Sequence, residues 1–372
     1  MLSRLSLLAL LGASVVLGSA RPERRARTGP LVAWIAGLQE TDGAARGAIA
    51  MSAAPSFTLD GEPYRHVVPY FANLAVASLL DAEPTTASVR VAEAWIHWFL
   101  DRVGPEGVPV EHWVGPGGAE QTCPAALATA PAMGRCEAID ATDSAASTFL
   151  IVLDATLRAG GDAAALARRA DEIRAVADAL LGLQLDDGLT VARAGWRVRY
   201  LMDNAETVAG LRAAARLERD VLGGDAGRFE RAAERATRGL AALRDPSTGL
   251  HAWARTDDGA LQPSRLDRWY ADAVAQVWPL VFGVTRDAGG YRQLDAAWSG
   301  DALPDWTVHR DASGFVWPVL AVAAVRAGDR AAARRQVDAL WRSHVERATG
   351  PLTVADVGWL LRAVHELETE PG

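Results

Sequence analysis

Apolar residues recur at helical spacing along nearly the whole chain, and this periodicity is the strongest constraint on its fold. Alternating β-branched runs bounded by turn residues are scarce, so strands have little support. Glycine, proline, aspartate and serine signals divide the chain into segments of helical length. The sequence therefore predicts twelve helices, at about residues 30–40, 66–82, 85–103, 141–159, 162–185, 201–220, 225–244, 266–285, 289–299, 313–328, 329–348 and 353–369.

The predicted helices alternate in character. Odd-numbered members, such as 162–185 and 227–243, carry arginine and glutamate on one face only, as expected of helices with one solvated side. Even-numbered members, such as 144–155 and 205–215, are apolar and small nearly all round. Six outer helices paired with six buried inner helices predict an all-α fold, an (α/α)6 toroid of six helical hairpins. Because the hairpins share one core, we expect a single domain over 30–372, although the length alone suggests two.

The first residues and the cysteines indicate export from the cytoplasm. Arg4, an apolar run and small residues at 18–20 are typical of a signal peptide over 1–20, followed by an expected flexible segment, 21–29. Cys123 and Cys136 are the two cysteines, and in an oxidising compartment we expect them to form a disulfide that stabilises the fold by about 3 kcal/mol. No later run is long and apolar enough for an integral membrane segment. The predicted location is secreted or periplasmic.

Charge and motifs exclude several functions. The formal net charge is −8, and the only basic cluster is at 21–27, so nucleic acid is not an expected partner. A GxSxG elbow, an HExxH helix, a P-loop and a GxGxxG turn after a strand are all missing from the sequence. We therefore expect no metal and no cofactor.

The longest predicted connections, 104–139, 186–200, 245–264 and 300–312, each run from an outer helix to the next inner helix. They would therefore share one rim with the first turns of the inner helices. Long ordered loops usually build a functional site. The candidate residues on this rim are carboxylates, aromatics and a few other polar groups: His66, Trp113, Asp140, Asp143, Tyr200, Asp203, Asn204, Glu206, Trp269, Tyr270 and Asp272.

Carboxylates beside flat aromatic rings suit a carbohydrate substrate, because glycoside hydrolysis needs one carboxyl group as acid and another as base or nucleophile. Asp143 and Asp203 open neighbouring inner helices and form the leading catalytic pair, with Asp272 as a third candidate. Asp140, Asn204, Glu206, His66, Trp113, Tyr200, Trp269 and Tyr270 are the expected sugar-contacting residues. Structural roles compete with these assignments. Asp203 and Glu206 fit a capping box, Asp140 fits a helix cap, and many of the tryptophans fit the core.

Four segments resemble bacterial members of the six-hairpin glycosidase superfamily: LQETDG at 38–43, DATDSAASTFL at 140–150, MDNAE at 202–206 and WYADAVAQVWP at 269–279. The resemblance implies the same toroid and a glycoside hydrolase that cleaves a polysaccharide or oligosaccharide without a cofactor. The superfamily also resembles sugar epimerases and polysaccharide lyases built on the same ring.

Two alternatives stay open at this point. A polysaccharide lyase would use Tyr200, Tyr270 or His66 as base, with a residue such as Arg199 to neutralise a uronate. A toroid without catalytic activity would bind glycans or cell-envelope proteins, because fold alone does not decide function.

Overall fold

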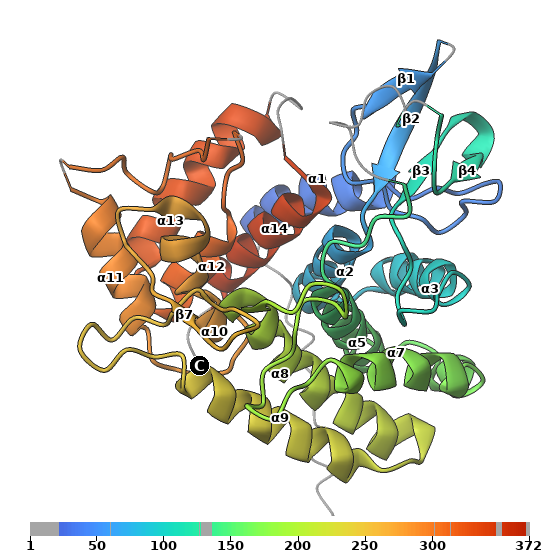
Figure 1. Ribbon diagram of the computed structural model, residues 1–372. Helices are drawn as coiled ribbons and strands as arrows, with labels where there is room; N and C mark the ends of the chain where they lie inside the picture. The colour runs from blue at the N-terminus through green and yellow to red at the C-terminus, as the bar shows by residue number, and fades with distance from the viewer. Residues whose placement is uncertain are drawn as a thin grey trace, which may run out of the picture.

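Six helices form a closed inner ring. The computed structural model describes residues 22–369, apart from 60, 126, 128–135, 301, 313 and 347–351; the predicted signal peptide, 1–20, lies outside the described residues. Around the ring each inner helix packs against the next, and the last packs against the first. The inner helices are α2 (Pro69–Ala82), α5 (Thr142–Arg158), α8 (Leu201–Leu217), α10 (Trp278–Val281), α12 (Val319–Arg326) and α14 (Val354–Glu368) (Figure 1).

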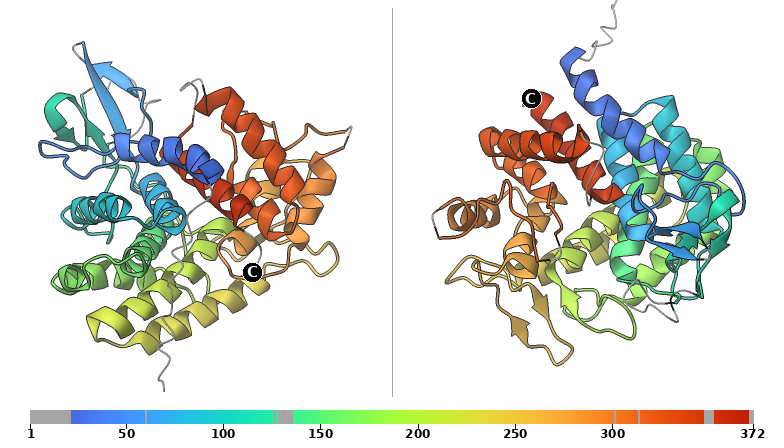
Figure 2. Two further views of the ribbon diagram at one scale, coloured as in Figure 1. Left: turned by 180° about the vertical axis from the view of Figure 1, so that it is seen from behind. Right: turned by 90° about the horizontal axis from the view of Figure 1, so that it is seen from above.

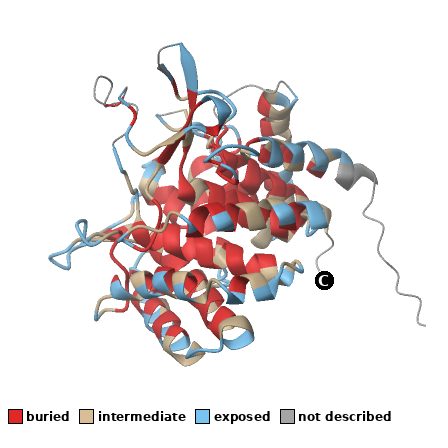
Figure 3. Ribbon diagram, turned by 90° about the vertical axis from the view of Figure 1, so that its right-hand side faces the viewer, coloured by how far each residue is buried: buried red, intermediate tan, exposed pale blue. Residues whose placement is uncertain are grey.

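A second layer of helices surrounds this ring. These outer helices are α1 (Pro22–Gly37), α3 (Thr86–Leu100), α6 (Ala163–Ala167) with α7 (Ala170–Gly182), α9 (Ala226–Ala241), α11 (Gly289–Trp298) and α13 (Arg330–Leu340). Buried residues fill the inner layer, whereas the outer helices expose one side to solvent (Figure 3). The predicted (α/α)6 toroid is confirmed. Within the described part of the chain, none of the helices has the length and apolar character needed to cross a membrane.

Proline residues explain two departures from the predicted helices. The fourth inner helix, expected over 266–285, is broken into a π-helical turn at Trp269–Ala273 and the short α10, because Pro279 lacks an N–H and its ring displaces the preceding turn. The fifth begins at Val319 rather than near 313, because Pro318 disfavours helical geometry in the residue before it. The segment expected to be flexible, 21–29, is instead helical from Pro22 onward.

Two small antiparallel sheets, which the sequence did not predict, lie on one side of the ring (Figure 2). The first contains β1 (Phe57–Leu59), β2 (Glu62–Val67), β3 (His112–Val114) and β4 (Glu120–Gln121); the second contains β5 (Arg199–Tyr200), β6 (Ala254–Arg255) and β7 (Leu261–Gln262). All of these strands come from connections that run from an outer helix to the next inner helix. The long connections therefore share one rim, as expected. The predicted disulfide between Cys123 and Cys136 is present, in the connection between β4 and α5.

Small residues let the inner helices approach closely. A Cβ atom added to Gly210 of α8 would lie 2.6 Å from Cα of Ser147 in α5, and one added to Gly358 of α14 would lie 2.7 Å from Cα of Ala75 in α2. Real side chains do not pack at these distances, so glycine is required at both crossings. These two glycines therefore allow α8 to approach α5 and α14 to approach α2.

We expect Gly210→Ala to destabilise the protein by about 1–3 kcal/mol, because the added methyl group forces α8 away from α5. The matched control is Gly182→Ala at the exposed end of α7, where a Cβ atom would have no neighbour within 4 Å. That change should leave stability unchanged or raise it slightly. Urea denaturation of both variants measures the difference, and an equal effect of the two substitutions would contradict the proposed role of Gly210.

Candidate active site

A cavity of about 330 Å³ opens on the axis of the ring at the rim where the inner helices begin. All six inner segments contribute to it, so the cavity depends on the closure of the ring. Its volume lies near the lower end of the range for small-ligand sites, about 300–1,000 Å³. The residues that define its chemistry are four carboxylic acids, Asp140, Asp203, Asp311 and Asp356, and seven aromatic residues, Tyr70, Phe71, Tyr270, Trp278, Phe315, Trp317 and Trp359.

The four cavity carboxyls form two groups on opposite walls. Asp140 precedes α5 and Asp203 lies in the first turn of the neighbouring helix α8. Asp311 precedes α12 and Asp356 lies in the first turn of the neighbouring helix α14. Since α5 and α8 lie across the ring from α12 and α14, a ligand in the cavity would have carboxyl groups on both sides.

Asp143, one of the predicted catalytic pair, is fully buried behind the cavity wall. Its carboxyl accepts hydrogen bonds from the hydroxyl of Thr190 (2.7 Å) and from the backbone N–H of Ser144 (2.8 Å). Burial raises the pKa of Asp143 to about 7 despite these bonds. Of the predicted pair, Asp203 lines the cavity and Asp143 does not.

Asp203 is surrounded by other carboxyl groups. Desolvation by the surrounding protein, followed by the like charges of Asp143 and Asp140, raises the pKa of Asp203 well above its usual range. The capping-box alternative is wrong for this residue, because the N-cap of α8 is Tyr200 and no side chain caps the helix there. Asp140 is not a cap either, since α5 begins after Ala141 without a side-chain cap. Both carboxyls are thus left for the cavity.

Glu206 lies beneath the cavity floor, one helical turn beyond Asp203. Its Oε1 accepts hydrogen bonds from the hydroxyl of Tyr70 (2.7 Å) and from Nε1 of Trp278 (2.9 Å). Burial and the charge of Asp203 raise the pKa of Glu206 to about 8. Ser144 lies close enough to lower that pKa, but its hydroxyl forms no hydrogen bond of normal geometry with a described residue. Glu206 therefore connects three inner segments and holds Tyr70 in the wall.

The opposite wall is organised by Asp311 and Asp356. Asp356 and Thr353 form a capping box at the start of α14, and burial raises the pKa of Asp356 to about 7. The carboxyl of Asp311 accepts hydrogen bonds from the backbone N–H of Phe315 (3.1 Å) and from Nε1 of Trp317 (3.2 Å). Asp311 thereby fixes the ring of Trp317, which stacks on Tyr270 with 5.2 Å between centroids.

Several predicted site residues have structural roles instead. Asp272 accepts a hydrogen bond from the backbone N–H of Arg265 (2.9 Å) and is absent from the cavity lining. Asn204 is buried and uses its amide to hold the backbone of Thr190. Trp269 is buried against Trp298. Tyr270 has an extended backbone (φ −106°, ψ 135°) within the turn at Trp269–Ala273, so that the ring of Trp269 packs in the core and the ring of Tyr270 lines the cavity.

His66 and Trp113 lie together on the first sheet, away from the cavity lining. Their rings stack with centroids 3.9 Å apart, and Nε2 of His66 lies 2.8 Å from Oε2 of Glu111. Trp113 is fully buried in a small cluster with Phe57 and Tyr64, so its face is not available to a sugar.

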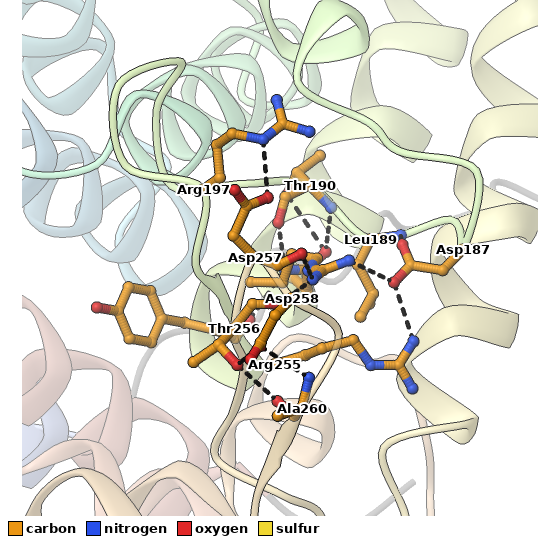
Figure 4. Close-up of polar contacts among 12 residues, drawn as sticks. Asp187, Leu189, Thr190, Arg197, Arg255, Thr256, Asp257, Asp258 and Ala260 are labelled. Carbon is orange, nitrogen blue, oxygen red and sulfur yellow. Dashed lines mark hydrogen bonds and ion pairs between the residues drawn. The ribbon is translucent and has the colours of Figure 1, made fainter.

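A polar network supports the second sheet beside the cavity (Figure 4). Asp187 accepts hydrogen bonds from Arg199 and Arg255, both at 3.0 Å. Arg197 pairs with Asp257 at 2.9 Å, and Arg199 also donates to the carbonyl of Thr256. The network joins the loop before α8 to the hairpin of β6 and β7, and it includes the segment in which Thr190 holds Asp143. It therefore fixes the wall on the Asp203 side.

The opposite end of the ring differs in charge. A second cavity there is lined by Arg158, Arg212, Arg216, Arg326 and Arg362. Most of these guanidinium groups pair with Asp81, Asp154 or Glu366, and Arg212 donates to the carbonyl of Gly283. Arginines at helix C-termini interact favourably with the partial negative charge of the free carbonyl groups there. The arginines of this second cavity therefore stabilise the fold.

Asp311, Phe315, Trp317 and Trp359 line the cavity but were not among the predicted site residues. Asp311 lies in a predicted loop without an apolar pattern, and Trp359 lies within a helix that looks wholly buried. One signal was available: Phe315, Trp317 and Asp356 stand at the starts of the last two inner helices, as the other candidates do at theirs.

Comparison with solved structures gives matches that span most of this chain. A glycosidase in complex with glucose is 14% identical with a TM-score of 0.61, over 94% of this chain and 99% of its own. A novel alpha-amylase from Clostridium perfringens is 10% identical with a TM-score of 0.59, over 91% and 96%. A rhamnosidase from Klebsiella oxytoca with rhamnose bound is 15% identical with a TM-score of 0.56, over 94% and 64%.

No protein-family model matches the chain, and no curated protein matches its sequence. The structural likeness confirms the six-hairpin glycosidase-like fold expected from the sequence. At these identities it bears on the fold, and the chemistry must be argued from the cavity.

The raised pKa of Glu206 predicts a dependence of stability on pH. Folding raises this pKa from 4.5 to about 8, so the folded state binds the proton more tightly. The associated stabilisation is complete below about pH 4.5 and is lost as the pH rises through 8. We expect Glu206→Gln, which keeps the acceptor for Tyr70 and Trp278, to lose less stability than the wild type between pH 5 and pH 9.

Urea denaturation across this pH range measures the effect. Glu234→Gln, at an exposed position of α9, is the matched control and should follow the wild type. A Glu206→Gln variant that loses stability as steeply as the wild type would contradict the assignment.

Proposed function

We propose that the protein is a glycoside hydrolase whose active site is the axial cavity. The observation that carries the proposal is the arrangement of carboxyl groups on two opposite walls, with aromatic rings between them. Hydrolysis of a glycosidic bond needs an acid on one side of the bond and a base or nucleophile on the other. Flat aromatic rings suit the C–H faces of sugars. The expected substrate is a polysaccharide or oligosaccharide.

Asp203 is the proposed general acid. The acid must hold a proton at working pH, and a raised pKa meets that need. Asp203 would donate this proton to the glycosidic oxygen as the bond from that oxygen to the anomeric carbon breaks. Asp143 would act through Asp203 as a positioning residue, because its charge raises the pKa of Asp203 from behind the wall.

The Asp311–Asp356 pair is the proposed source of the base. These carboxyls face Asp203 across the cavity, where one of them would take a proton from the water that adds to the anomeric carbon. Tyr70, Tyr270 and Trp317 would contact the sugar. Asp272, which was one of the predicted catalytic residues, has no part in this proposal.

A uronate lyase fits the cavity less well. Such an enzyme must neutralise a substrate carboxylate, whereas four carboxyl groups line this cavity. The same lining favours a neutral or cationic sugar over an anionic one. We also propose that the protein is exported, on the support of the signal-like sequence at 1–20 and the disulfide.

We expect Asp203→Asn to lower hydrolysis by at least about a hundredfold, since general acid catalysis contributes about 10²–10⁴. The purified protein is screened against soluble starch, mixed-linkage β-glucan, galactomannan and polygalacturonate, recording reducing ends and near-ultraviolet absorbance. Asp272→Asn is the matched control, because an asparagine Oδ1 still accepts from Arg265. Rising absorbance would indicate a lyase, and no product from any substrate would favour a glycan-binding protein without catalytic activity.

A second prediction concerns Asp143. Removing its charge should lower the pKa of Asp203, so Asp203 loses its proton at a lower pH. The alkaline limb of the kcat/KM profile should therefore move to lower pH in Asp143→Asn, while activity at acidic pH is largely retained. If the profile keeps its shape and only the amplitude falls, Asp143 has no electrostatic role in catalysis.

A further inference from the structure

The large apolar side chains that the described residues expose are concentrated on the cavity rim. They are Trp196 (51% exposed), Leu261 (46%), Tyr270 (61%), Val308 (63%) and Phe315 (40%). All five belong to segments between an outer helix and the next inner helix. Exposed apolar groups that gather on one face usually mark a binding surface.

Three aromatic residues on this rim form what we term the rim platform: Trp196, Tyr200 and Trp253. Nε1 of Trp196 donates a hydrogen bond to the hydroxyl of Tyr200 (3.0 Å). The ring of Tyr200 is stacked against Trp253, with centroids 6.0 Å apart and planes within 21°. The indole N–H of Trp196 is thus used to orient the ring, while half of the side chain remains open to solvent.

The rim platform leads to the cavity. Tyr200 immediately precedes α8, and Asp203 in the first turn of that helix lines the cavity. Tyr270, which also lines the cavity, stacks on Trp317. Aromatic rings therefore lie both in the cavity wall and on the second sheet, whose strand β5 leads directly into α8.

The platform is held in place by buried charges. Arg199, in the strand that ends at Tyr200, is almost fully buried and pairs with Asp187. Asp187 also pairs with Arg255 in β6, two residues after Trp253 (Figure 4). The strand that ends at Tyr200 and the strand that follows Trp253 are thereby fixed to one carboxylate. A preformed surface loses less entropy on binding than a mobile one.

We propose that the rim platform is a sugar-binding subsite outside the cavity, and that the substrate is a neutral glycan chain longer than the cavity can hold. The inference rests on the proposed function. One sugar unit of the chain would lie in the cavity between the two carboxyl walls. Later units would stack on Tyr200, Trp253 and Trp196, whose uncharged faces suit a neutral pyranose.

The test compares a disaccharide and a hexasaccharide of the linkage that the protein cleaves, with Trp196→Ala, Trp196→Phe and Glu234→Ala. One lost stacking contact should lower kcat/KM on the hexasaccharide by about three- to tenfold, chiefly through KM. The disaccharide, which does not reach the platform, should be cleaved at the wild-type rate. Trp196→Phe should recover part of the loss, and the control Glu234→Ala, at an exposed position of α9 away from the rim, should show none.

Affinity electrophoresis in gels that contain soluble starch, mixed-linkage β-glucan or galactomannan separates this inference from the proposed function. Retardation of the wild type that is lost in Trp196→Ala supports the subsite even where nothing is hydrolysed. Equal losses on the disaccharide and the hexasaccharide would overturn it. Wild-type protein that no gel retards, or retardation unchanged in Trp196→Ala, would also overturn it.

Discussion

Close packing of the inner helices is the constraint on which the site depends. Gly210 against Ser147 and Gly358 against Ala75 allow neighbouring helices to approach at distances that a Cβ atom would forbid. Because the ring closes at this diameter, the first turns of all six inner segments meet around one cavity. A wider ring would separate the two carboxyl walls, and a broken ring would have no axial cavity.

Burying the acidic groups at this rim costs electrostatic free energy. Asp143, Asp203, Glu206 and Asp356 all have raised pKa values because the surrounding protein desolvates them. Uncompensated burial of a carboxyl group is unfavourable, and groups perturbed in this way concentrate at functional sites. Outer helices such as α3 and α9 use Thr85 and Asp225 as N-caps, whereas α5 and α8 begin without side-chain caps. Asp140 and Asp203, near the starts of these two helices, therefore line the cavity and do not cap a helix, whereas Asp356 both lines the cavity and belongs to the capping box of α14.

The fold was predictable because the apolar pattern records burial directly. Helices buried all round alternate with one-sided helices, and a two-layered ring satisfies that alternation. The breaks at Pro279 and Pro318 were also visible as prolines, but their effect on which side chains face the cavity was not. Within the turn at Trp269–Ala273, the extended backbone of Tyr270 leaves Trp269 in the core and Tyr270 in the cavity lining, and the apolar pattern does not record this change of backbone. Asp143 and Asp203 look equivalent in the sequence, but Asp143 is the second residue of α5 and Asp203 is the third residue of α8. Asp143 lies behind the cavity wall, and Asp203 lines the cavity.

A crystal structure of Asp203→Asn soaked with an oligosaccharide from the hydrolysis screen is the most direct test of this account. The account predicts a sugar unit in the axial cavity, its glycosidic oxygen within hydrogen-bond reach of residue 203, and later units against Trp253 and Trp196. A saccharide bound away from the cavity, or one whose glycosidic oxygen lies beyond the reach of residue 203, would contradict the assignment of Asp203 as the acid.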